Sequence, residues 1–112
     1  MRDDRLYLIH IQESIGRIES YLAGKGQADF FASTLIQDAI LRNLQTLAES
    51  TQRLPPDWKA KHPEIDWAKI YGFRNVVAHD YLGIDLERVW KILERDLPAL
   101  KNTIAAMLEE FK

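Results

Sequence analysis

The sequence of 112 residues has no cysteine, which excludes disulfide bonds, thiol catalysis and thiolate metal sites. It also lacks a long apolar run: the longest, from Ile104 to Leu108, is far shorter than the roughly 20 residues that span a bilayer. The amino-terminal residues MRDDRLYLIH are acidic and polar where a secretion signal needs an apolar stretch. We therefore expect a soluble, cytoplasmic protein that makes no membrane contact.

The sequence has little excess charge of either sign. Fifteen Lys and Arg residues against 17 Asp and Glu residues give a net charge of −2. This balance argues against a protein that coats nucleic acid through its bulk charge, so any phosphate-binding site must be local. The three histidines are scattered, and with no cysteine the chain offers few metal ligands. We expect no metal site and no cofactor.

The spacing of apolar residues predicts helices and no convincing strand. Apolar residues three and four positions apart predict a first amphipathic helix; they are Leu8, Ile11, Ile15, Ile18 and Leu22. The closely spaced Gly24 and Gly26 predict its end. A second helix is predicted from Asp29, as its N-cap, to Ser50, with an apolar stripe of its own.

Prolines and capping residues divide the rest of the chain. The segment 54–57, with two consecutive prolines, ends the second helix, and a short helical turn is predicted from Asp57 to Lys61. Asp66 is the expected N-cap of a third helix, from Trp67 to about His79, and Asp85 is that of a fourth.

The fourth helix carries an apolar stripe that stays in phase for seven turns. Its members are Leu86, Val89, Trp90, Leu93, Leu97, Leu100, Ile104, Met107, Leu108 and Phe111. Pro98 lies inside this stripe and removes a backbone donor, so it should kink or divide the helix. The predicted fold is a single all-α domain over residues 1–112, an up-and-down bundle of four to five helices.

Arg74 has an unusual place in the predicted third helix. At about 100° per residue it lies in the middle of an apolar stripe, which predicts a buried guanidinium. Because arginine does not lose its proton, a buried guanidinium needs an acid, a carbonyl group or an external anion. One interpretation is a salt bridge to Asp38 or Glu64 on another helix. The other is a site that binds an anion.

His79, Asp80 and Tyr81 come soon after Arg74, at the predicted end of the same helix, where the helix dipole favours a protonated imidazole. On an ideal helix His79 would lie about 140° away from Arg74. The helix must therefore unwind there, or a second copy of the chain must complete the site across a two-fold axis. The structural alternatives are that His79 caps the helix and that Tyr81 packs against Trp90 or Tyr71.

The octapeptide from Arg74 to Tyr81 resembles the R-x4-H-x-Y motif of HepT-like toxins of the HEPN superfamily. Further landmarks of that pattern recur in order over nearly the whole chain. They are Tyr21 with Gly24, Phe30, Gln37-Asp38-Ala39, Arg42-Asn43-Leu44, Arg53-Leu54-Pro55, Pro63-Glu64-Ile65 with Trp67, Ile70-Tyr71-Gly72-Phe73, Val89-Trp90 and Asp96-Leu97-Pro98. One departure is Ala48-Glu49-Ser50, where the family often has Gly-Glu-Ala; it affects helix packing and leaves the motif intact.

The resemblance implies an all-α HEPN bundle that forms a homodimer and acts as a metal-independent ribonuclease. It implies the toxin of a type VII-like, HepT/MntA-type toxin–antitoxin system. The partner would be an MNT-type nucleotidyltransferase antitoxin, which in this family is associated with AMP transfer onto the motif tyrosine, here Tyr81. Arg74 and His79 correspond to the catalytic arginine and histidine.

The residue types suit RNA cleavage without a metal. Histidine titrates near neutrality, so His79 can move the protons, while Arg74 stabilises the charge that grows on the phosphoryl oxygens. Asn75 would support the site through hydrogen bonds, and Asp80 would orient it. Two other functions stay open: a non-catalytic module that pairs with the nucleotidyltransferase and binds RNA or nucleotide, and a structural dimer in which Arg74 is a salt-bridge residue of the core.

Overall fold

The computed structural model of the chain describes residues 3–75 and 85–112, and the regular elements in these ranges are all helical. Before the gap they are α1 (Arg5–Tyr21), α2 (Gln27–Ala32), α3 (Thr34–Gln52), α4 (Pro56–Ala60) and α5 (Trp67–Tyr71). After it they are α7 (Leu86–Lys91), the π-helical segment η2 (Ile92–Asp96) and α8 (Leu97–Glu109). The predicted all-α fold is confirmed.

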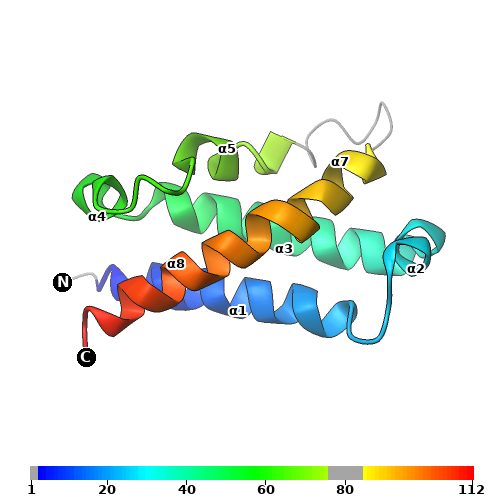
Figure 1. Cartoon of the computed structure of the whole chain (residues 1–112), viewed down its shortest axis with the longest axis horizontal. Helices are drawn as coiled ribbons and strands as arrows, with labels where there is room; N and C mark the ends of the chain where they lie inside the picture. The colour runs from blue at the N-terminus through cyan, green and yellow to red at the C-terminus, as the bar shows by residue number, and fades with distance from the viewer. Residues whose placement is uncertain (1–2, 76–84) are drawn as a thin grey trace.

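Three long helices form the body of the bundle (Figure 1). Helices α1 and α3 pack against each other in antiparallel directions, and α8 packs against α1. The short α5 packs on α3, on the side of the molecule where α7 also lies. The start of α1 and the end of α8 lie at the same end of the bundle. No helix in the described ranges is both long and apolar enough to cross a membrane.

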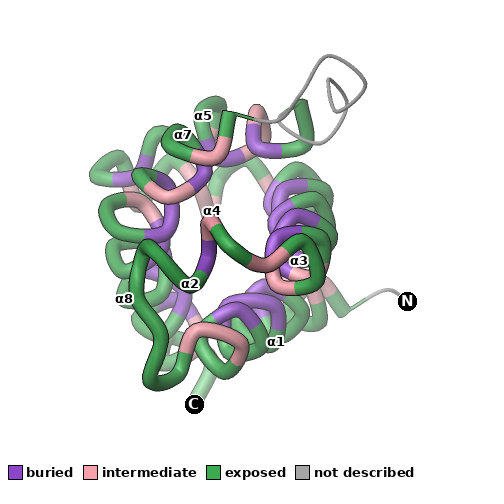
Figure 2. The backbone as a smooth tube through the Cα atoms, turned by 90° about the vertical axis from the view of Figure 1, so that its right-hand side faces the viewer, coloured by how far each residue is buried: buried purple, intermediate pink, exposed green. Residues whose placement is uncertain are grey.

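The predicted apolar stripes form the core. The side chains of Leu8, Ile11, Ile15 and Ile18 on α1 are at most 2% exposed, and the buried stretches of the long helices turn toward the centre of the bundle (Figure 2). They pack together with buried residues of the other elements: Phe30, Ile40, Leu41, Leu44, Leu47, Ala48, Leu54, Ile65, Ile70, Phe73, Val89, Ile92, Leu93, Leu97, Leu100, Ile104 and Met107. One continuous core therefore holds α5 and α7 in place.

The predicted second helix is divided, so its predicted start is wrong. Asp29 is not an N-cap but lies in the first turn of α2, where its carboxylate accepts a hydrogen bond from the backbone N–H of Gly26 at 2.9 Å. The chain is extended at Ser33, whose side chain caps α3 by accepting from the N–H of Ile36 at 3.2 Å. Each short helix thus has a cap of its own.

Gln37 stabilises the break between α2 and α3. Its side-chain amide donates to the carbonyl oxygens of Phe30, at 2.9 Å, and Phe31, at 3.2 Å, in the last turn of α2. The ring of Phe30 is fully buried, 5.6 Å from the ring of Trp90 between centroids. The hydrogen bonds from Gln37 thus hold the end of α2, with its buried aromatic side chain, against the start of α3.

The predicted division near Pro98 is confirmed and takes the form of a π-helical segment. Pro98 lies in the first turn of α8, directly after η2, and has no N–H to donate to the carbonyl of Glu94 four residues earlier. The apolar stripe stays on the core side through this segment, from Val89 to Met107. Asp85 caps α7 as predicted, because its carboxylate accepts from the N–H of Arg88 at 3.1 Å.

Candidate active site

Helix α5 comes directly before the turn that carries the first residues of the motif, Arg74 and Asn75. Asp66 is its N-cap, as predicted, and accepts a hydrogen bond from the N–H of Lys69 at 3.1 Å. The side chain of Ile70 is 3% exposed and that of Phe73 is 2% exposed, so both anchor this part of the chain in the core. The buried anchors fix which way the following residues point.

The predicted third helix does not run on regularly to Asn75, because a turn at Gly72 ends α5. The N–H of Phe73 donates to the carbonyl of Ile70, and the N–H of Asn75 donates to that of Gly72, each across three residues. Side chains three residues apart eclipse each other in such a tight turn. Phe73 therefore follows Ile70 into the core, and the next residue, Arg74, is directed outward.

Arg74 is exposed, so the prediction that it lies buried in an apolar stripe is wrong. Its guanidinium carbon lies 4.3 Å from the centre of the Tyr71 ring. The predicted salt bridge is not formed with either described candidate: Glu64 contacts His62 and Thr103 instead, and no ion pair joins Arg74 to Asp38. An exposed guanidinium stacked on an aromatic ring stays available for an anion.

The other predicted site residues are placed only in part. Asn75 is exposed, and its backbone N–H closes the turn on Gly72 at 3.0 Å. His79, Asp80 and Tyr81 lie outside the described residues. The approach of His79 to Arg74, the roles of Asp80 and Tyr81, and a site completed by a second copy therefore stay predictions.

A basic cavity that the sequence reasoning missed lies beside this part of the chain. It measures about 190 Å³ and lies between α5 with its following turn and the α7–η2 segment. Its lining residues are Lys69, Phe73, Arg88, Lys91, Ile92, Arg95 and Asp96. The spacing of Arg88, Lys91 and Arg95, three and four residues apart, was the available signal, since such residues share one face of a helix.

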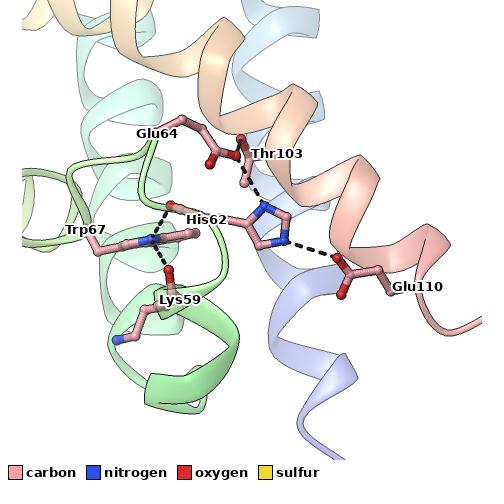
Figure 3. A network of polar contacts seen from close by, with 6 residues as sticks. All are labelled: Lys59, His62, Glu64, Trp67, Thr103 and Glu110. Carbon is pink, nitrogen blue, oxygen red and sulfur yellow. Dashed lines mark hydrogen bonds and ion pairs between the residues drawn. The ribbon is translucent and has the colours of Figure 1, made fainter.

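A polar network fixes the chain just before α5 (Figure 3). The two ring nitrogens of His62 contact Glu64 and Glu110, each at 3.2 Å, and Thr103 on α8 donates to Glu64 at 3.3 Å. The indole N–H of Trp67 is shared between the carbonyl oxygens of Lys59 and His62, both at 3.1 Å. The network ties the start of α5 to α4 and to the end of α8.

Two groups of this network have shifted pKa values. The pKa of Glu64 is lowered, chiefly because its carboxylate accepts a hydrogen bond from its own backbone N–H, with further bonds from His62 and Thr103. Burial lowers the pKa of Lys59, whose ammonium donates to the carbonyl of Thr51 at 3.2 Å. In the described part of the chain, no three His, Asp or Glu side chains gather as they would to hold a metal ion.

Comparison with known proteins identifies relatives over almost the whole chain. A protein of Methanocaldococcus jannaschii named gamma-glutamylcyclotransferase and putative RNase is 36% identical over 97% of this chain and 49% of its own length. The chain thus spans about half the length of that relative. A probable ribonuclease HepT of Thermococcus cleftensis is 34% identical over 90% of this chain and 92% of its own.

A putative RNase of Caldanaerobacter subterraneus subsp. tengcongensis is 26% identical over the full length of both chains. No solved structure matches the chain. The family model described as ribonuclease HepT-like matches residues 11–107, which include the motif from Arg74 to Tyr81. The chain belongs to the HepT-like ribonuclease family of the HEPN superfamily.

Proposed function

We propose that the chain is the toxin of a toxin–antitoxin pair, a metal-independent endoribonuclease of the cytoplasm with Arg74 and His79 as its catalytic residues. Family membership over residues 11–107 supports a ribonuclease. The observation that carries the assignment to this site is the exposure of Arg74, stacked on Tyr71 rather than used in a salt bridge of the core. Such a guanidinium is free to bind a phosphodiester.

The proposed reaction uses the ribose 2′-hydroxyl as nucleophile. His79 takes the proton of that hydroxyl, and its oxygen attacks the adjacent phosphorus. The bond to the 5′ oxygen breaks as that oxygen gains a proton, from His79 of the same or the second subunit. Arg74 donates hydrogen bonds to the phosphoryl oxygens as their charge grows. The products are a 2′,3′-cyclic phosphate and a 5′-hydroxyl, and Asn75 and Asp80 support the two catalytic residues.

We further propose that two copies of the chain form a homodimer with a shared cleft. On a regular helix His79 would lie about 140° around the axis from Arg74 of the same chain, so the two side chains would not meet at one phosphate. In a two-fold dimer, His79 of one copy would act together with Arg74 of the other.

Tyr81 is the proposed point of control. A nucleotidyltransferase antitoxin of the MNT type would transfer AMP to its hydroxyl. The added phosphate would place negative charge near Arg74, and the tethered nucleotide would compete with RNA at a high effective concentration. Inhibition would be both electrostatic and steric.

Cleavage of RNA by the purified chain tests the nuclease. We expect the wild type to cut RNA in the presence of chelator and to leave cyclic phosphate ends, and we expect His79→Ala to be inactive. Expression of the wild type in bacteria should arrest growth, and expression of His79→Ala should not. If wild type and His79→Ala are equally inactive but bind RNA or nucleotide, the non-catalytic module is the correct function.

Mass spectrometry tests the control by AMP. Co-expression with the neighbouring nucleotidyltransferase should add one or more AMP masses to the peptide that contains Tyr81, and Tyr81→Phe should remain unmodified and toxic. An unmodified tyrosine in the neutralised complex contradicts this part of the proposal.

A further inference from the structure

The basic cavity between α5 and α7–η2 has an uncompensated positive charge. Of the four cations that line it, Lys69 is paired with Asp96 at 3.1 Å. Arg88, Lys91 and Arg95 are exposed and form no ion pair within residues 3–75 and 85–112. Among the described residues, Asp96 is the single acid in the lining. Three of the four cations are therefore available to an anion.

The three cations form a row on one side of the α7–η2 segment. At 1.5 Å per residue, Arg88 and Arg95 are separated by about 10 Å along the axis. Of the acids of the same segment, Glu87 and Glu94 do not line the cavity, and Asp96, which does, is paired with Lys69. The row is thus long enough to contact more than one phosphate of a strand, and the described carboxylate beside it is already paired with Lys69.

The floor of the cavity is apolar. The side chain of Phe73 is 2% exposed and that of Ile92 is 4% exposed. Charges beside a low-dielectric surface attract each other more strongly than charges surrounded by water. A phosphate that lies on this floor would therefore be held more strongly than one bound by isolated surface lysines.

The size and position of the cavity favour a strand over a free nucleotide. Its volume of about 190 Å³ is smaller than the roughly 300–1,000 Å³ of sites that enclose whole small molecules. Phe73, in the lining, directly precedes Arg74 in the chain. We therefore expect a strand whose scissile phosphate lies at Arg74 to place a neighbouring phosphate at the cavity.

We infer that Arg88, Lys91 and Arg95, with Lys69 at the edge, bind the backbone phosphates of single-stranded RNA next to the phosphodiester that is cut. This inference rests on the proposed ribonuclease function and assigns its substrate-binding surface. These residues position the RNA and take no part in the proton transfers. Because they contact the backbone, they contribute affinity without reading the base sequence.

Equilibrium binding of a labelled single-stranded RNA tests the inference. The full chain carries His79→Ala, so that the RNA stays intact, and the test variant adds Arg88→Gln, Lys91→Gln and Arg95→Gln. We expect affinity to fall at least about tenfold at low salt, and the slope of log K against log salt to decrease by about 2, since each lost contact to a single strand removes about 0.7. Circular dichroism and thermal melting test whether the triple variant is folded. If it is unfolded, Arg88→Gln alone replaces it, and a smaller decrease in affinity and in salt slope is expected.

A matched control removes the same charge elsewhere. Lys25→Gln, Arg42→Gln and Lys61→Gln change three exposed cations that lie outside the cavity, and this variant should bind RNA nearly as the parent does. Equal weakening by control and test variants overturns the inference, because bulk charge would then explain both. RNA binding unaffected by the test variant, or no RNA binding by the parent, also overturns it.

Two more measurements separate this inference from the proposed function. Cleavage by the chain with native His79 tests the nuclease alone: absence of cleavage contradicts the proposed function, while loss of binding in the test variant still supports the RNA surface. Binding of labelled ATP tests whether the cavity binds a free nucleotide instead of an RNA strand. If the test variant loses ATP binding and keeps RNA binding, the cavity is a nucleotide site and the inference is wrong.

Discussion

The guanidinium of Arg74 is stacked on the ring of Tyr71, with 4.3 Å between its central carbon and the ring centre. Tyr71 is the last residue of α5 and half-buried, whereas Arg74 follows the turn and is exposed. Stacking occupies the face of a guanidinium and leaves the N–H groups at its edge free to donate. The pair thus orients the cation for a phosphate without neutralising it.

Replacing Tyr71 tests this orienting role. Tyr71→Leu should lower the rate of RNA cleavage about two- to fivefold, the factor that corresponds to the roughly 0.5–1 kcal/mol of an exposed cation–π contact. Tyr71→Phe keeps the ring and should cleave at nearly the wild-type rate. Single-turnover cleavage of a short RNA measures both. If Tyr71→Phe is as slow as Tyr71→Leu, the hydroxyl group matters and stacking is not the cause.

Replacing Arg74 should separate activity from stability. We expect Arg74→Ala to lower the cleavage rate about 10²- to 10³-fold, as loss of a donor to a developing oxyanion does. Its free energy of unfolding should change by less than about 0.5 kcal/mol, since an exposed side chain with no ion pair to residues 3–75 and 85–112 contributes little. Cleavage assays and urea denaturation measure the two effects.

Arg74→Lys is the control for charge. Lysine keeps the cation but lacks the planar fork that stacks on a ring and binds two oxygens, so an intermediate rate is expected. A marked loss of stability in Arg74→Ala would instead favour the structural role that the sequence left open.

Much of the fold follows from features that act locally. The stripe from Leu8 to Ile18, the caps at Asp66 and Asp85 and the interruption near Pro98 were all predictable, because each depends on residues close in the chain. The division at Ser33 was not. The cap that Ser33 forms and the bonds from Gln37 to the end of α2 hold this break. The spacing of apolar residues does not show it, because Phe30 lies on the core side of a straight helix as well.

The candidate site, too, could be predicted only in part from local sequence patterns. The helical wheel placed Arg74 among apolar residues because it assumed about 100° per residue throughout. Tight hydrogen bonds across Gly72 change that angle, so Phe73 takes the inward place and Arg74 the outward one. Because a helical wheel adds the same angle for each residue, one irregular turn makes the predicted direction of every later side chain wrong. The basic cavity also needed the structure, since Lys69 and Arg95 come from different elements.

Trp67 should stabilise the fold through its indole N–H. Trp67→Phe keeps an aromatic ring but leaves the carbonyl oxygens of Lys59 and His62 without this donor. We expect a loss of about 1 kcal/mol and a decrease in Tm of about 4 °C. Trp58→Phe is the matched control, because the Trp58 ring packs on Phe111 and its indole N–H has no hydrogen-bond partner in the described ranges. Equal decreases in Tm for both variants would assign the effect to ring size.

Glu64 should make stability depend on acid pH. Its pKa in the folded chain lies below the usual 4.5, mainly through the hydrogen bond from its own backbone N–H and then through those from His62 and Thr103. A carboxyl group with a lowered pKa contributes stability above its unfolded pKa and loses it as pH falls through the folded value. The advantage of wild type over Glu64→Gln should thus be full above about pH 4.5 and shrink below it. Thermal melting at pH 3–6 measures this difference in stability.

Glu94→Gln is the control, because it removes an exposed carboxylate without hydrogen bonds to the described residues. The difference in Tm between this variant and the wild type should change less with pH than the difference for Glu64→Gln. A Glu64→Gln difference that stays constant across this range would mean that the carboxylate charge plays no part in holding the start of α5.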